Sequence, residues 1–279
     1  VVSDYGISRG DVRAILYGIG VLGSIDMEYM WTKIVDIANK NNITPGGDTD
    51  CAQANTAMFL AGGLTSKNVS HTIAAVARAI AGARSLVAIE CGATGPTKDC
   101  GYENPIVKSI ASVPICAEGK TATCAHSDLM GNLTAAVCDV WSNESVYNRE
   151  EMGGATPGVW LQSLGYECAL MNTATQIGTN KDLRDTYVLA DKYRDPQGVI
   201  LAYDNAYKIG EAITAEGEDI YLRSRAAALK ACELINEAVE EKRILLTRFE
   251  RDTLDSTQKT YEQLPEDQDK FVKTCIKRY

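Results

Sequence analysis

Histidines and long apolar runs are scarce in this sequence, and both shortages narrow its possible functions. Only 2 of the 279 residues are histidines, which leaves little from which to build a Ser-His-Asp hydrolase centre. No stretch of about 18 residues is uninterruptedly apolar, and no basic segment precedes a shorter apolar one. We therefore expect neither a membrane span nor a secretory signal, and a cytoplasmic location.

Positive charge is also in short supply. The 28 lysines and arginines are outnumbered by 37 acidic residues, which gives a net charge of -9 at pH 7. A surface of this kind does not attract nucleic acid or anionic lipid by charge alone. The remaining composition, with 45% hydrophobic and 23% charged residues, is typical of a globular chain that buries a substantial core.

Cysteine is more plentiful. The chain has 9 cysteines, an odd number spread along its whole length. Small secreted domains that depend on disulfides have short chains and paired cysteines. We therefore interpret these residues as free thiols, some of which bind a metal ion.

The apolar pattern predicts an α/β fold. Residues 69–80 have helical spacing, and the short apolar runs at 85–91 (SLVAIEC) and 113–118 (VPICAE) are typical of strands buried on both faces. After each run a polar loop leads into a predicted helix, at Asn104-Pro105 and at 131–141. This alternation is the rhythm of a parallel α/β fold.

The C-terminal third differs from the rest of the chain in its pattern of charged and apolar residues. Past about Arg184 the sequence is charged and amphipathic, with its strongest helical segment at 219–242 and no evident strand. Near the N-terminus, Gly18 to Gly23 have the spacing of a dinucleotide-binding loop, but the residues before them have the spacing of a helix rather than a strand. We interpret these glycines as positions that permit close packing or end a helix.

Two cysteines stand in polar segments that contain glycine, and they favour a metal site. Cys51 follows GGDTD and Cys100 follows GPTKD, and we expect separate loops to bring the two thiols to one mouth of the fold. Thiolates combined with an oxygen ligand favour Zn²⁺. The spacing is also compatible with two buried structural thiols. Cys124, whose loop contains His126 and Asp128, is a competing ligand.

Glu90 is a carboxylate near the end of an apolar run. Such a group is paired, bound to metal, or placed at the mouth of a site, and a plain salt bridge is the structural alternative. His126 lies in a loop after the second predicted strand, where catalytic groups gather in parallel α/β folds.

Six segments are long and specific enough to compare with known families: DVRAILYGIGVLGSIDME, GGDTDCAQANTAMFLAGG, KDCGYENP, EGKTATCAHSDLMGN, CDVWSNES and RAAALK. Together they resemble the methanol:corrinoid methyltransferases, the zinc subunits of methanogenic archaea. The resemblance implies a TIM-type (β/α) barrel, here lacking its N-terminal strands. Residues 1–183 would form the partial barrel with the zinc loops, and residues 184–279 a helical region packed on it.

The resemblance also implies a reaction. Cys51 and Cys100 would bind one catalytic Zn²⁺ together with a glutamate that, in the family, lies upstream of the position of Val1. The methyl group of methanol would pass to the Co(I) corrinoid of a partner protein in a hetero-oligomer, the first step of methanogenesis from methanol. The candidates for orienting the alcohol or supplying a proton are Asp48, Asp50, Glu90 and His126.

Two other functions stay open on the sequence. One is a zinc methyltransferase that acts on another methyl donor. The other is a docking subunit that binds the corrinoid protein without turnover, which the missing third ligand favours.

Overall fold

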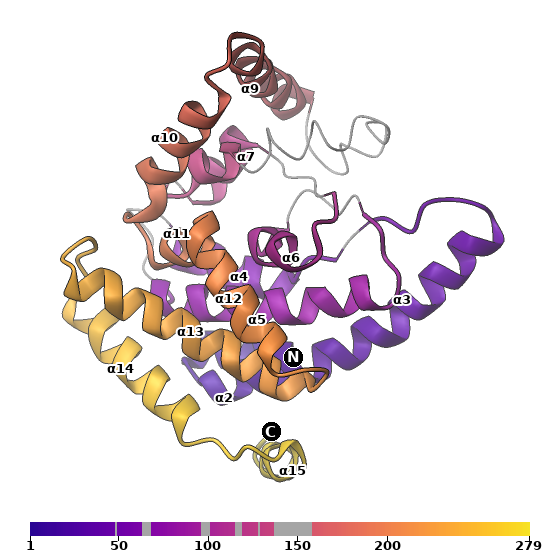
Figure 1. Cartoon of the computed structure of the whole chain (residues 1–279). Coiled ribbons are helices and arrows are strands. Elements are labelled where there is room, and N and C mark those ends of the chain that lie inside the picture. The colour runs from indigo at the N-terminus through magenta and orange to yellow at the C-terminus, as the bar shows by residue number, and fades with distance from the viewer. Residues whose placement is uncertain (48, 63–67, 96–100, 115–118, 128, 137–157) are drawn as a thin grey trace.

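The regular elements in the described part of the chain are helices (Figure 1). The computed structural model describes residues 1–47, 49–62, 68–95, 101–114, 119–127, 129–136 and 158–279. Its elements are α1 (Val2–Arg9), α2 (Val12–Ile15), the π-helix η1 (Leu16–Leu22), α3 (Gly23–Lys40), α4 (Ala52–Ala61), α5 (His71–Glu90), α6 (Asn104–Ala111), α7 (Lys120–His126), α9 (Gly158–Ile177), α10 (Asn180–Lys192), α11 (Pro196–Leu201), α12 (Tyr203–Ala215), α13 (Ile220–Glu240), α14 (Arg248–Glu262) and α15 (Gln268–Arg278).

Helix α5 is the centre of the structure. It begins at His71, where the Ser70 hydroxyl accepts a hydrogen bond from the Thr72 backbone N–H at 3.1 Å and so caps the helix. Most of its side chains are buried, because α3, α4, α6, α11, α13 and α14 all pack against it. Figure 1 shows α5 in the middle of the molecule, beside α13.

The apolar character of α5 follows from this position. Among the described residues, α5 is the helix that is long and apolar enough to cross a membrane, and 89% of its most apolar window is buried inside the molecule. Length and composition of this kind are equally those of the core helix of a folded protein.

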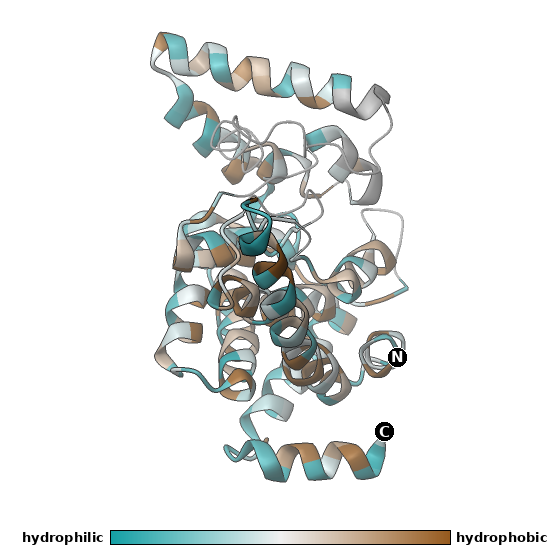
Figure 2. Ribbon diagram, turned by 90° about the vertical axis from the view of Figure 1, so that its right-hand side faces the viewer, coloured by the Kyte–Doolittle hydropathy of each residue, from teal (hydrophilic) through white to brown (hydrophobic). Residues whose placement is uncertain are grey.

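The C-terminal helices complete the same core. Phe271 of α15 stacks on Tyr221 of α13 with ring centres 4.6 Å apart, and the Tyr261 hydroxyl of α14 donates to the Val12 carbonyl at 3.0 Å. Figure 2 shows α15, beside the C-terminal label, with both teal and brown residues along its length, as expected of an amphipathic helix. One hydrophobic cluster therefore contains residues from both ends of the chain.

The glycines between Gly18 and Gly23 pack helices together, as predicted. Gly18 and Gly20 lie in η1 and Gly23 begins α3, and a Cβ added at Gly20 would lie 2.6 Å from the Cβ of Ser224 on α13. The absence of a side chain at Gly20 therefore sets how closely η1 and α13 approach.

The predicted strand at 85–91 is wrong. Residues 85–90 are the last turns of α5, and Cys91 caps its C-terminal end. The run is apolar because the helix is surrounded by protein, and a short apolar run looks the same in a buried helix and in a buried strand. The helices predicted at 69–80 and at Asn104 are confirmed, and residues 131–136 are helical.

The structure tests only some of the remaining fold predictions, which concern the second strand, the barrel, the C-terminal helices and the domain division. In the second predicted strand, Val113 and Pro114 have no regular structure, and 115–118 lie outside the described residues. No strand occurs in the described part of the chain, so the TIM-type barrel stays a prediction. The helical character past Arg184 is confirmed. The division between residues 183 and 184 falls inside α10 and likewise stays a prediction.

Candidate functional site

Cys51 lies at the N-terminal end of α4 and is fully buried. Its backbone N–H donates to the Glu103 carboxylate at 2.8 Å, and its Sγ lies 3.7 Å from Oε1 of Gln53. The Cys51 backbone is therefore held by a hydrogen bond, and the thiol, which belongs to the main hydrophobic cluster, has Gln53 as a polar neighbour.

Glu103 is the second buried group of this site. Its Oε1 accepts from Cys51 and lies 2.9 Å from the Ser85 hydroxyl, while its Oε2 accepts from Nη1 of Arg78 at 2.7 Å. The side chains of Arg78 and Glu103 are both 0% exposed. The guanidinium of Arg78 also lies 5.2 Å from the centre of the Tyr102 ring. Arg78 therefore contacts two consecutive residues, Tyr102 and Glu103.

Helix α5 holds the residues just before Cys51 as well. Nη1 of Arg84 donates to the Asp50 carbonyl at 2.9 Å, and the Ser85 hydroxyl lies 2.7 Å from the Thr49 carbonyl. The backbone from Thr49 to Cys51 is thus held at two carbonyls and one N–H. We call Arg78, Ser85, Glu103 and Cys51 the Cys51 network.

The Cys51 thiol is protonated at neutral pH in this environment. Burial raises the pKa of the Cys51 thiol above its ordinary value, the charge of Arg84 opposes this rise, and the charge of Glu103 adds to it. A metal ion binds the thiolate, so metal binding at Cys51 has to release this proton.

Asp50 is joined to the Cys51 network through an amide. Its Oδ2 accepts from Nδ2 of Asn55 at 2.8 Å, and Oδ1 of Asn55 accepts from Arg78 at 2.8 Å. Asp48 and Cys100, predicted beside it, lie outside the described residues.

Glu90 and His126 are not brought into the Cys51 network by any described contact. The Glu90 carboxylate, 43% exposed at the end of α5, pairs with Arg223 of α13 at 2.8 Å and 2.9 Å, which is the salt bridge considered as its structural alternative. His126 is the last residue of α7, and its side chain lies outside the described part. Cys124, the competing ligand, is exposed on α7, and Asp128 lies outside the described residues.

Of the two predicted zinc ligands, the structure describes Cys51. No group of three His, Cys, Asp or Glu side chains in the described part of the chain is placed to hold a metal ion. Both oxygens of Glu103 are engaged by Cys51, Ser85 and Arg78. Cys51 supplies a thiol of the kind zinc prefers, at a fixed and buried place. Cys100, the second predicted ligand, lies outside the described residues.

Sequence reasoning missed Arg78 and Glu103. A signal for Arg78 was present, because it is a charged residue inside the apolar helical run at 69–80, where a charge has to be paired. Glu103 stands three residues after Cys100, but its contact with Cys51 joins positions 52 residues apart and leaves no local pattern.

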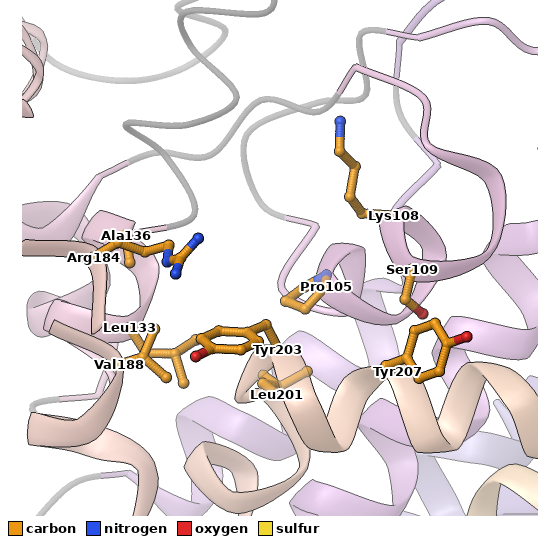
Figure 3. A pocket seen from close by; sticks show the side chains of 10 residues that line it. All are labelled: Pro105, Lys108, Ser109, Leu133, Ala136, Arg184, Val188, Leu201, Tyr203 and Tyr207. Atoms are coloured by element: carbon orange, nitrogen blue, oxygen red, sulfur yellow. The ribbon is translucent and has the colours of Figure 1, made fainter. Parts of the chain in front are cut away.

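A separate cavity of about 290 Å³ lies against α6, α10 and α12. Its floor is apolar, with Lys108 and Arg184 at its edge, and the Arg184 guanidinium lies 5.1 Å from the centre of the Tyr203 ring (Figure 3). Mostly apolar cavities with a few polar groups are typical of small-molecule sites. None of its described lining residues belongs to the Cys51 network.

Comparison with known families identifies the chain. The model of the methanol-cobalamin methyltransferase B subunit, MtaB, matches residues 1–279. The chain belongs to this family. Membership confirms the family resemblance inferred from the sequence segments.

Relatives of known function or structure extend this match. The methanol--corrinoid protein co-methyltransferase of Methanosarcina barkeri (strain Fusaro / DSM 804) is 54% identical over 278 residues, which are 100% of this chain and 60% of that protein. In the crystal structure of the methanol:cobalamin methyltransferase complex MtaBC from Methanosarcina barkeri, one chain is 49% identical with a TM-score of 0.89, again over 100% of this chain and 60% of that chain. This chain thus spans about 60% of the length of these MtaB-family relatives.

Proposed function

We propose that this chain is the zinc-holding part of a methanol:corrinoid methyltransferase. In this proposal Cys51 and Cys100 bind the catalytic zinc, and the methyl group of methanol passes to the Co(I) corrinoid of a partner protein in a hetero-oligomer. The observation that carries it is the hydrogen bond from the Cys51 N–H to Glu103 at 2.8 Å. Because Glu103 stands three residues after Cys100, this bond joins the segments that contain the two predicted ligands.

The residues around Cys51 have defined tasks in this reaction. Zinc, when bound, stabilises the negative charge that builds on the alcohol oxygen as the C–O bond breaks. Cys51 supplies one thiolate, and its complete burial keeps water from that side of the site. Burial raises the pKa of the Cys51 thiol, and the charge of Arg84 opposes part of this rise.

The leaving oxygen also needs a proton to depart as water. Asp50 is fixed by Asn55 next to Cys51, so we place it first among the candidates for orienting the alcohol or moving this proton. Asp48 and His126 remain candidates for the same task. Glu90 is the weakest candidate, because its carboxylate is already paired with Arg223.

Zinc content and methyl transfer test the proposal. The protein is purified as its gene encodes it, and zinc per chain and methylcobalamin formation are measured for the wild type, Cys51→Ala and Cys100→Ala. We expect both variants to lose zinc and at least 100-fold in rate, because each removes a metal ligand. Cys232→Ala is the matched control, since Cys232 is a buried thiol on α13.

Two outcomes contradict the proposal. Unchanged zinc and activity in both cysteine variants would remove the metal site. Tight binding of the corrinoid protein, with no zinc and no methyl transfer in the wild type, would instead support the docking function. Competition between methanol and other methyl donors separates the proposed substrate from the alternative ones.

A further inference from the structure

We propose that Glu103 is a positioning residue, which with Arg78 holds the backbone of Cys51 and the turn at residues 101–104 in place relative to each other. This inference rests on the proposed function. Glu103 contacts no predicted substrate, and both of its carboxylate oxygens are used by groups of the protein. It acts on the metal through the backbone of Cys51.

The ion pair between Arg78 and Glu103 is costly to bury, which favours a role in geometry over a role in stability. Arg78 and Glu103 are both fully buried, and removing two charges from water costs about as much as their attraction returns. A pair of apolar side chains of similar volume is often as stable, so overall stability alone does not account for the pair. What the ion pair adds is a fixed geometry, because Arg78 and the Cys51 N–H each hold one oxygen of the carboxylate.

The contacts of Glu103 and α5 with the backbone at residues 49–51 link Glu103 to the position of Cys51. Oε1 of Glu103 accepts from the Cys51 N–H, while Arg84 and Ser85 hold the two carbonyls before it. All of these side chains come from α5 or from Glu103 itself. A displacement of Glu103 would therefore shift the backbone of Cys51 relative to the rigid core helix.

The turn at residues 101–104 is held by the same ion pair. Gly101 and Asn104 close it through a backbone hydrogen bond of 2.9 Å, and a Cβ at Gly101 would collide with the side-chain amide of Asn104. Tyr102, inside the turn, lies under the guanidinium of Arg78. The residues that follow Cys100 are thus held by the same arginine that holds Glu103, so one ion pair fixes both segments.

Zinc affinity measured by competition with a chelator tests this role. Glu103→Gln keeps the shape of the side chain and removes its charge, which leaves Arg78 unpaired. Changes to groups that orient metal ligands typically cost about 10–100-fold in metal affinity, and we expect a loss in this range. In the Co²⁺-substituted protein, the visible absorption bands should shift in position or intensity, because the coordination geometry changes.

Glu250→Gln is the matched control. Glu250 is also a buried carboxylate beside α5, where it accepts hydrogen bonds from Ser70, His71 and Thr72 at the opposite end of the helix. We expect this variant to lower the free energy of unfolding while zinc affinity and the Co²⁺ spectrum stay at wild-type values. If Glu103→Gln does not fold, Ser85→Ala decides the question, with an expected affinity loss of about five-fold from the lost hydrogen bond.

The outcomes separate this inference from the proposed function. Wild-type zinc affinity and an unchanged Co²⁺ spectrum in Glu103→Gln, or in Ser85→Ala where the first variant does not fold, would overturn the positioning role while Cys51→Ala still loses zinc. Zinc retained by Cys51→Ala would overturn the proposed function itself. Equal losses of zinc affinity in Glu103→Gln and Glu250→Gln would show a general structural effect and would also overturn the positioning role.

Discussion

Fully buried thiols occur in two kinds of surroundings in the described part of this chain. Cys51 and Cys232 both belong to the main hydrophobic cluster, but Cys51 also has the carboxylate of Glu103 and two arginines close by. The difference matters because a thiol without polar partners binds its proton more tightly as it is buried. The sequence indicates one side of this difference, since Cys51 follows a polar segment.

The stability of the protein should fall at alkaline pH because of Cys232. Burial, and secondarily the charge of Glu262, raises the pKa of Cys232 from 9.0 to about 12. Between these two pH values the folded state holds a proton that the unfolded state has lost. The contribution of Cys232 is therefore fully present below pH 9 and decreases as the pH rises toward 12, by at most about 1.4 kcal/mol per pH unit.

Urea unfolding of the wild type and Cys232→Ala between pH 7.5 and 10.5 measures this effect. At the lower pH the two proteins differ only by the cost of the removed sulfur atom. Above pH 9 the wild type should lose stability faster than the variant. Parallel curves over the whole range would contradict the assignment.

Reasoning at the scale of single residues found Cys51 but not its partners. The polar segment before Cys51 is visible in the sequence, and in the structure polar side chains hold the backbone of this segment. Glu103 and Arg78 were missed because a buried ion pair is formed by packing between elements. The role of Cys100 stays a prediction.

At the scale of elements, the contact between η1 and α13 depends on the absence of a side chain. Alanine is the better helix former, yet a Cβ at Gly20 would lie 2.6 Å from the Cβ of Ser224. We expect Gly20→Ala to lower the free energy of unfolding by about 1–3 kcal/mol through overpacking. Urea unfolding measures the change.

Gly165 of α9 provides the control for this prediction. A Cβ there has no atom within 4 Å, so Gly165→Ala should raise the free energy of unfolding by up to about 1 kcal/mol. The double variant Gly20→Ala with Ser224→Gly should recover part of the loss, since it removes the opposing atoms. A stabilised Gly20→Ala would show that the two helices separate without cost.

The sequence of this protein does not distinguish a buried helix from a buried strand. The spacing of apolar residues predicts the helix at residues 69–80. The same helix continues to Glu90, but there every side of it is apolar, and this pattern predicts a strand. Spacing reveals an element only when one face meets water. In α5 that condition fails, since α13 and α4 cover faces that would otherwise be polar.

At the scale of the whole molecule, one core joins the N-terminal and C-terminal helices. Phe271 of α15 is 2% exposed and contacts both Tyr221 and Tyr17. We expect Phe271→Ala to lower the free energy of unfolding by about 3–5 kcal/mol and to shift a single cooperative transition. Circular dichroism and tryptophan fluorescence, followed in the same urea titration, should give coincident curves.

Phe249→Ala is the comparison for this change, because the Phe249 side chain is 64% exposed. Its effect should stay within about 0.5 kcal/mol of zero. Two separate transitions in Phe271→Ala would indicate that the helices past residue 183 fold as an independent unit. That result would support the domain division predicted from the sequence and contradict the single core.

The burial of α5 also has a consequence for how the protein is made. The glutamate that caps this helix lies 180 residues after Ser70, and ribosomes add roughly 5–20 residues per second. A nascent chain therefore carries a strongly apolar helix that α3 and α4 can cover only in part for on the order of 10–40 s, before the C-terminal helices that complete its cover have been synthesised. During that interval molecular chaperones have to shield it, so recombinant yield should depend on the chaperone supply of the host.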